Sequence, residues 1–238
     1  MIKKIILIAT LFTAVSCAEL QQVVDNLPQQ TGSILGNADI ASGLREALNL
    51  GIDKQVSKLT AKDGFYKNNL VKILLPEELK KVDKGLRDIG LSKLADEGLK
   101  ILNTAAEDAV KEATPIFINA VKGITFNDAK NILMGNDNAA TQYLTSKTKT
   151  ALYAKFNPVI KNSFAKVGAD KIWTNLINKY NAIPFTANVN PNLTDYVTSQ
   201  ALNGVYKMIT VEEKEIRSKV SSRSTELLKK VFALQDNK

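Results

Sequence analysis

The sequence predicts a single, mostly α-helical domain with at most a small two-stranded β element. Apolar residues recur every three or four positions over most of the chain, as they do along the buried face of an amphipathic helix. Residues that start or end helices stand between these segments at short intervals. The 238 residues, 45% of them hydrophobic, are enough for one large buried core.

The clearest helix boundaries form a corner at mid-chain. Thr125 followed by Asp128 is typical of a helix N-terminus, because the hydroxyl accepts a backbone N–H and the carboxylate favours the positive helix end. We expect Gly135 to end this helix in the left-handed conformation. Asp137 or Asn138 is then expected to cap the next helix, so that two helices meet through a short polar turn.

Other helices are expected on both sides of this corner. Asp39 is predicted to cap a helix that ends at Gly64, Pro76 starts another, and a longer alanine-rich helix extends from Ser92 to about Ala113.

After the corner, one helix is expected to end at Pro158, and further helical segments extend to Tyr180. Asn192 caps a helix, residues 210–213 form a capping box for a separate one, and residues 222–234 are the final amphipathic segment.

One β pairing is predicted, between two short segments. Residues 70–75 contain Val71, Ile73 and Leu75 in alternation, and residues 185–189 follow two helical segments in a proline-containing stretch. If the domain has a β element, we expect these two segments to form it.

The first residues predict export and lipidation. Residues 1–16 combine a basic start with an apolar run too short to span a membrane, which is typical of a signal peptide. The run ends Ala-Val-Ser-Cys at residues 14–17, which resembles a bacterial lipobox with alanine in place of the usual leucine. We expect lipidation (palmitate) at Cys17, a tether over residues 17–37, and the α-helical domain over residues 38–235. The alternative is ordinary secretory cleavage that leaves a free thiol.

A lipidated Cys17 predicts a place in the bacterial cell envelope. Two or three acyl chains would anchor the protein to a membrane. We expect the outer membrane, facing the periplasm, because the residues after Cys17 lack a run of acidic side chains.

Composition excludes several classes of enzyme. The chain contains no histidine and one cysteine. It therefore has no Ser-His-Asp or Cys-His system, no histidine zinc site and no intrachain disulfide. No metal and no cofactor is predicted.

Two acidic residues of the long helix are weak catalytic candidates, Asp96 and Glu107. A buried carboxylate can act as a general acid or base. Because Asn103 and Glu107 share a helix face, a structural hydrogen-bond network is the preferred interpretation.

Two further polar groups are interpreted as structural. The turn at residues 135–138 offers oxygens but lacks the ordered calcium loop. The Glu213 and Arg217 pair is expected on a helix surface.

Four arginines stand out in a lysine-rich chain. We expect them to pair across helices with carboxylates such as those of Glu107, Asp128 or Glu213, and phosphate binding is the alternative. They are Arg45, Arg87, Arg217 and Arg223.

The positive charge is concentrated in one stretch. Between Lys147 and Lys179 there are seven lysines and one acid, Asp170, in a chain of net charge +8. These lysines either form a solvated surface or bind an anionic membrane or polymer. Four of them are predicted to make the binding contacts. The four are Lys155, Lys161, Lys166 and Lys171. Nucleic acid is not an expected partner, because aromatic residues do not alternate with the basic ones.

Several strings resemble a bacterial family known as domain of unknown function 4197. They are GLREALNLGIDKQVSKL from Gly43, DGFYKNNLVKILLPEEL from Asp63, the run from Asn103 to Leu144, KFNPVIKNS from Lys155, and TDYVTSQALNGVYKMITVEEKEIRSK from Thr194. The resemblance implies a helical envelope domain, often a lipoprotein, and no known activity.

Three classes of function follow from these observations. The first is a lipid-anchored interaction or binding module, whose partners are the membrane through Cys17 and an anionic envelope surface or another envelope protein. The second is a carboxylate-dependent hydrolase of an envelope polymer. The third is a carrier of an apolar ligand near Phe117, Phe126 and Tyr143. No catalytic signature favours an enzyme.

Overall fold

The structure is a computed structural model that describes residues 35–75, 80–90, 92–182, 184–185 and 188–236. The predicted signal peptide, Cys17, most of the tether and the predicted helix start at Pro76 lie outside these residues. Residues 35–238 make one compact unit, and every member of its buried core falls between Ala41 and Phe232. This unit therefore contains the apolar residues that it needs to fold on its own.

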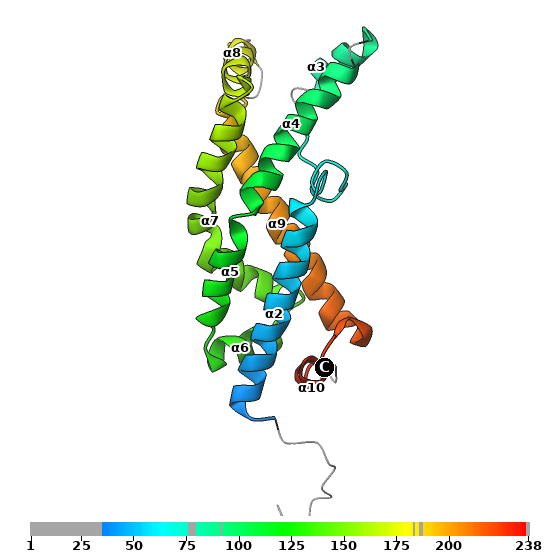
Figure 1. Cartoon of the computed structure of the whole chain (residues 1–238), viewed down its shortest axis with the longest axis vertical. Helices are drawn as coiled ribbons and strands as arrows, with labels where there is room; N and C mark the ends of the chain where they lie inside the picture. Colours follow the sequence, from blue (N-terminus) through cyan, green and yellow to red (C-terminus); the bar gives the residue numbers. More distant parts are fainter. Residues whose placement is uncertain (1–34, 76–79, 91, 183, 186–187, 237–238) are drawn as a thin grey trace, which may run out of the picture. The chain divides into compact units, whose positions relative to one another are not determined.

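The mostly α-helical fold is confirmed, and no β-strand occurs in the described ranges (Figure 1). The helices are α2 (Asn37–Thr60), α3 (Lys80–Asp88), α4 (Ser92–Val110), α5 (Ala113–Lys122), α6 (Phe126–Leu133), α7 (Ala139–Ala165), α8 (Ala169–Asn181), α9 (Leu193–Ser218) and α10 (Glu226–Ala233), with a 3₁₀ turn η2 (Val220–Ser222).

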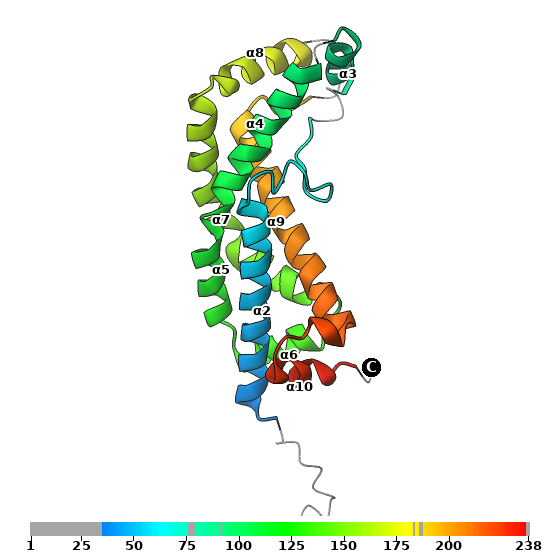
Figure 2. The ribbon, with the colours of Figure 1, turned by 45° about the vertical axis from the view of Figure 1, so that its right-hand side comes forward.

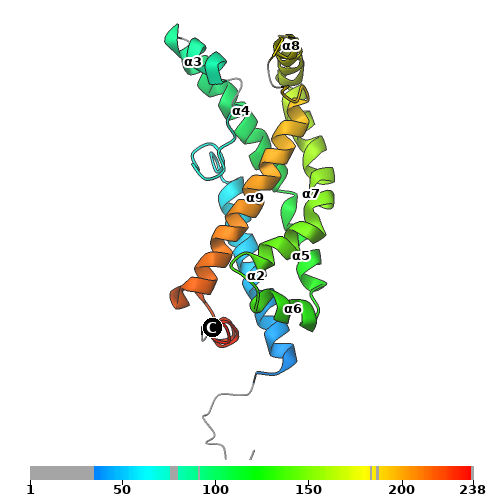
Figure 3. The ribbon, with the colours of Figure 1, turned by 180° about the vertical axis from the view of Figure 1, so that it is seen from behind.

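Helix α9 is the central element. It packs along α7 and also contacts α2 and α4, and Figure 3 shows it crossing in front of α2 and α4. The shorter α5 and α6 pack against α2 and α7, and α10 packs against α2. Helix α8 lies at the end of the unit that also carries the turn between α3 and α4, whereas α2 starts at the other end (Figures 1 and 2).

The described parts of residues 70–75 and 185–189 form no strand, and residues 186 and 187 lie outside the described residues. Backbone groups that would have joined a strand ladder are bonded by asparagine side chains. Asn103 accepts from Ile73 N at 2.8 Å and donates to Ile73 O at 2.9 Å. Asn181 accepts from Val189 N at 2.9 Å and donates to Val189 O at 2.8 Å. Each asparagine amide thus satisfies a segment that has no strand partner.

Two predicted helix boundaries after the corner are wrong. Helix α7 continues through Pro158, because Phe156, Ile160 and Phe164 keep its buried stripe intact on both sides of the missing N–H. Helix α9 continues through Thr210, whose hydroxyl donates to Tyr206 O instead of starting a new helix.

The first helix starts and ends earlier than predicted. It begins after Gly36, and Asp39 stands three residues into it, where its carboxylate accepts from Gly36 N at 2.9 Å. The helix ends at Thr60, and Gly64 lies in the turn that follows. In contrast, Asn192 caps α9 as predicted, since its side chain accepts from Asp195 N at 3.0 Å. Among the described helices, none combines the length and apolar composition that crossing a membrane requires.

Two glycines provide a matched test of this packing. A Cβ at Gly204 in α9 would lie 2.7 Å from the ring of the fully buried Phe65, whereas a Cβ at Gly98 in α4 would meet nothing within 4 Å. We expect Gly204→Ala to lower the free energy of unfolding by roughly 1–3 kcal/mol through overpacking. Gly98→Ala should raise it by roughly 0.5–1 kcal/mol, because alanine is the better helix former. Urea unfolding of both variants checks this, and a stabilised Gly204→Ala variant would contradict the packing described.

Candidate functional site

The corner at mid-chain begins as predicted. Asp128 N donates to Thr125 Oγ1 at 3.1 Å, and Thr125 N donates to the Asp128 carboxylate at 3.0 Å. The carboxylate also accepts from the Thr125 hydroxyl at 2.7 Å, and these two bonds from Thr125 hold the pKa of Asp128 below its usual value.

The cap of the next helix comes from a distant element, not from Asp137 or Asn138. Asn138 occupies the N-cap position of α7, but its side chain makes no capping bond. The carboxylate of Glu213 in α9 accepts instead, from Ala140 N at 2.9 Å and from Thr141 N at 2.8 Å. A buried negative charge thus closes the positive end of α7.

Arg217 completes this cluster from the next turn of α9. Its guanidinium bonds Glu213 Oε1 through Nε at 3.0 Å and Nη2 at 2.9 Å. It also donates to Leu133 O at 3.1 Å and to Ile132 O at 2.8 Å, at the C-terminus of α6. With a further bond to Gln235, the guanidinium has no N–H left for a phosphate.

Gly135 does not have the positive φ that was predicted. A Cβ at this position would lie 2.7 Å from the Cβ of Ala139. Glycine therefore permits the close approach of α6 and α7, while Arg217 satisfies the last carbonyls of α6.

Three of the four arginines bond a carboxylate, but none bonds one of the predicted acids across helices. Arg87 bonds both Asp83 and Asp96, and Arg223 bonds Asp236 at 2.6 Å. Arg45 donates to the carbonyl of Ile124. Of the predicted acidic partners, Glu213 is used by Arg217, but within its own helix rather than across helices, and the pair is buried rather than on the surface.

Asp96 and Glu107 do not form a catalytic pair. They are eleven residues apart on α4, which separates them by roughly 16 Å along the axis. Asp96 is exposed and accepts from Arg87 at 2.8 Å. Glu107 is 6% exposed and accepts from Phe65 N at 3.0 Å. Together with Asn103, it holds the connection between α2 and α3 in place, which agrees with the structural interpretation.

The predicted apolar-ligand site is not an enclosed cavity. Tyr143 lines a hollow of about 440 Å³ together with Ile116 and Lys147, and this hollow is open to solvent. Phe117 is fully buried and packs edge-on against Tyr206, with 6.1 Å between ring centroids. A cavity lined by Leu48, Ile52, Glu212 and Phe232 has a volume of only about 20 Å³. That volume holds about one water molecule.

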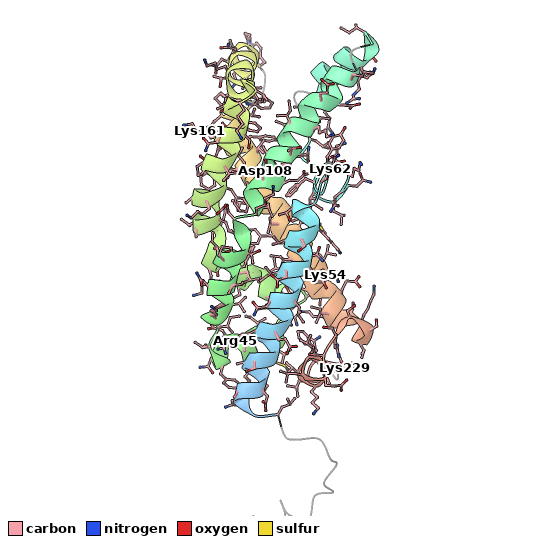
Figure 4. All side chains as sticks on the ribbon, in the orientation of Figure 1. Arg45, Lys54, Lys62, Asp108, Lys161 and Lys229 are labelled. Atoms are coloured by element: carbon pink, nitrogen blue, oxygen red, sulfur yellow. The ribbon has the colours of Figure 1, made fainter. Side chains whose placement is uncertain are left out.

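The four predicted surface lysines are all exposed, and Figure 4 marks Lys161 on α7 toward α8. In the part of the chain that the structure describes, none of the four lies within 4 Å of a carboxylate. Some other lysines form ion pairs, including Lys67, Lys111, Lys219 and Lys229. Further exposed lysines, such as Lys130, Lys207 and Lys230, have no carboxylate partner among the described residues either. The acid of this stretch, Asp170, accepts from the hydroxyl of Thr194 at 3.0 Å.

These lysines do not share one helix face. Lys155 and Lys161 are six residues apart on α7, so their side chains project in directions about 120° apart. Lys161 lines a hollow of about 440 Å³ between α7, α8 and α9, and Lys166 lines one of about 480 Å³ between α4 and α7. Lys161 and Lys166 therefore lie near the junction of α7 with α8, where Asp170, Glu97 and Asp108 line the same hollows, whereas Lys155 lies farther down α7.

The main feature that sequence reasoning missed is the burial of Glu213 and Arg217. A signal for it was present, because Ile209 and Ile216 continue the apolar stripe of α9 across this segment. A helix that stays buried on both sides of a charged pair is expected to bury the pair as well. The described residues contain no group of three or more acidic or cysteine side chains placed to hold a metal ion.

The fold and its unpaired lysines define a helical domain with a cationic surface and no assembled catalytic group in the described ranges. The chain belongs to the family described as "Protein of unknown function (DUF4197)", whose match covers residues 34–233. This match confirms the resemblance noted in the sequence. A search of curated proteins found no match. A search of solved structures found none either.

Glu107 gives a pH-dependence that can be tested. Burial raises the pKa of its carboxyl above the ordinary 4.5. The folded state therefore binds this proton more tightly than the unfolded state, and the contribution of Glu107 to stability is lost as pH rises from 4.5 through the folded pKa. Glu107→Gln should remove this loss while it keeps an acceptor for Phe65 N. The free energy of unfolding of the variant minus that of the wild type should rise with pH in this window. A difference that falls with pH would contradict the assignment.

Proposed function

We propose that this protein is a lipid-anchored cell-envelope protein that acts as a helical binding module for an anionic envelope surface. Anchoring is supported by the lipobox-like sequence that ends at Cys17. Binding is supported by the exposed lysines 155, 161, 166 and 171.

The observation that carries the binding role is that these lysines are unpaired. A lysine in an exposed ion pair already has its charge partly compensated, whereas an unpaired ammonium is available to a second surface. Each lysine close to an anionic membrane contributes about 1 kcal/mol. A lipid anchor would add to this by keeping the module at high local concentration near its target.

The hydrolase alternative has less support. A pair of carboxylates that cleaves a glycosidic bond lies about 5–10 Å apart across an open site. Asp96 and Glu107 are farther apart, and each is bonded to structural groups. The carrier alternative would need an enclosed apolar cavity, whereas the hollow beside Tyr143 is open to solvent and is lined in part by Asn119 and Lys147.

The lysine prediction has a matched control. In residues 35–238, Lys155, Lys161, Lys166 and Lys171 changed to Gln should abolish cosedimentation with vesicles that contain phosphatidylglycerol at low salt. The control changes the ion-paired Lys67, Lys111, Lys219 and Lys229 to Gln, which removes the same charge but should retain most of the binding. Equal loss in the two variants would mean that net charge alone drives binding, and unchanged binding in the first would reject the proposed surface.

Anchoring is tested separately. Cys17→Ser removes the thiol that we expect to be lipidated, so the full chain expressed in a bacterium should move from the membrane fraction to the soluble fraction. Incorporation of a labelled fatty acid should be lost in the same variant. A wild-type protein that never incorporates the label would reject the lipoprotein assignment.

A further inference from the structure

Helix α8 has exposed apolar residues at both ends. Val167, between α7 and α8, is 53% exposed, and Phe185, after α8, is fully exposed. Ile89, in the turn between α3 and α4, is 72% exposed and lies at the same end of the unit (Figures 1 and 2). Isolated exposed apolar residues are common on protein surfaces, so exposure alone does not indicate a partner. The arrangement of Val167 and Phe185 on either side of one helix that carries the unpaired Lys171 does indicate a partner.

Helix α8 is fixed across this end of the unit (Figure 2). Its Trp173 and Ile177 are buried, and Trp173 Nε1 donates to Asn190 O at 3.1 Å. Lys171 projects to solvent from the same helix. At 13 residues, α8 is roughly 20 Å long, so its two apolar ends are well separated.

Phe185 has a backbone conformation that is rare for an aromatic residue. Its φ is 67°, in the left-handed region that favours glycine. Its fully exposed ring makes no packing contribution that would offset this strain. Strained residues of this kind concentrate at functional positions.

The lysines of this end complement an anionic surface. Lys161 and Lys166 lie in the last two turns of α7 or at its end, and Lys171 lies in the first turn of α8. Lys155 points in nearly the same direction as Lys166 but lies roughly 16 Å farther down α7. A surface that meets this end of the unit would contact the first three lysines and leave Lys155 outside.

We propose that this end docks on an anionic lipid bilayer, with Val167 and Phe185 entering the interface and Lys161, Lys166 and Lys171 contacting the headgroups. A stable protein partner would cover one continuous surface, whereas Val167 and Phe185 are separated by the length of α8. A charged polymer would offer no apolar medium. The boundary of a bilayer accepts separate apolar side chains and attracts lysines between them. This proposal rests on the proposed function, because both require an anionic surface.

The test uses residues 35–238 and vesicles that contain either phosphatidylglycerol or phosphatidylcholine alone. Val167→Ser with Phe185→Ser should lower the affinity for anionic vesicles about tenfold or more, because the apolar side chains no longer leave water. The binding that remains should be lost completely in high salt. The matched control is Val220→Ser with Leu234→Ser, two exposed apolar residues near α10, and should bind like the wild type. Circular dichroism verifies that both variants are folded.

A second pair of variants tests the lysines. Lys161, Lys166 and Lys171 changed to Gln should lower the affinity on the order of a hundredfold. The matched control changes Lys130, Lys207 and Lys230 to Gln, three exposed lysines of α6, α9 and α10, and should lower the affinity much less.

The outcomes separate this proposal from the proposed function. Loss of binding in the lysine variant with normal binding in the serine variant would overturn bilayer insertion and leave the cationic surface intact. Binding to dextran sulfate but not to phosphatidylglycerol vesicles would do the same. A wild-type unit that binds neither of these would overturn both.

Discussion

The buried ion pair of Glu213 and Arg217 is the interaction on which the corner of this fold depends. One residue accepts from the first amides of α7, and the other donates to the last carbonyls of α6. Both belong to α9, so one pair fixes three helices. Two desolvated charges cost free energy unless their polar atoms are bonded, and here each oxygen of the carboxylate and each nitrogen of the guanidinium has a partner.

The same use of buried polar groups recurs wherever the backbone lacks a regular partner. Asn103 and Glu107 bond the connection after α2, and Asn181 bonds the connection before α9. Arg223 donates to Ile216 O and Arg217 O at the end of α9. These groups have structural tasks, which is why the carboxylates and arginines that looked chemically interesting do not assemble a reaction site. Unpaired lysines also lie on other helices of the described residues, but three of them, Lys161, Lys166 and Lys171, gather where α7 meets α8.

A hydrogen bond between residues close in the sequence could be predicted, whereas one between distant residues could not. The bonds between Thr125 and Asp128 span three residues and follow from the motif. The bond from Ala140 to Glu213 spans 73 residues, and no local pattern encodes it. Alternation at residues 70–75 predicted a strand because a sequence does not show whether a strand or an asparagine will bond the backbone. Pro158 failed as a boundary because burial of the flanking residues outweighed one missing hydrogen bond.

For the candidate surface, the sequence predicted which lysines are exposed, but not that they lack ion pairs. Their different directions on α7 could have been derived from the spacing of six residues between Lys155 and Lys161. The position of Val167, Lys171 and Phe185 at one end of the unit follows from the placement of α8, which depends on Trp173 and Ile177 packing into the core. Tertiary packing of α8 thus places part of the lysine-rich stretch at one end of the unit.

The most direct test of this division between structural and unpaired charges is amide-resolved NMR of residues 35–238 with phosphatidylglycerol vesicles that carry a paramagnetic lipid. The account predicts that line broadening is confined to the end of α7, α8 and the connection that follows it. Broadening centred on the corner between α6 and α7 or on α10, or spread evenly over the unit, would contradict it.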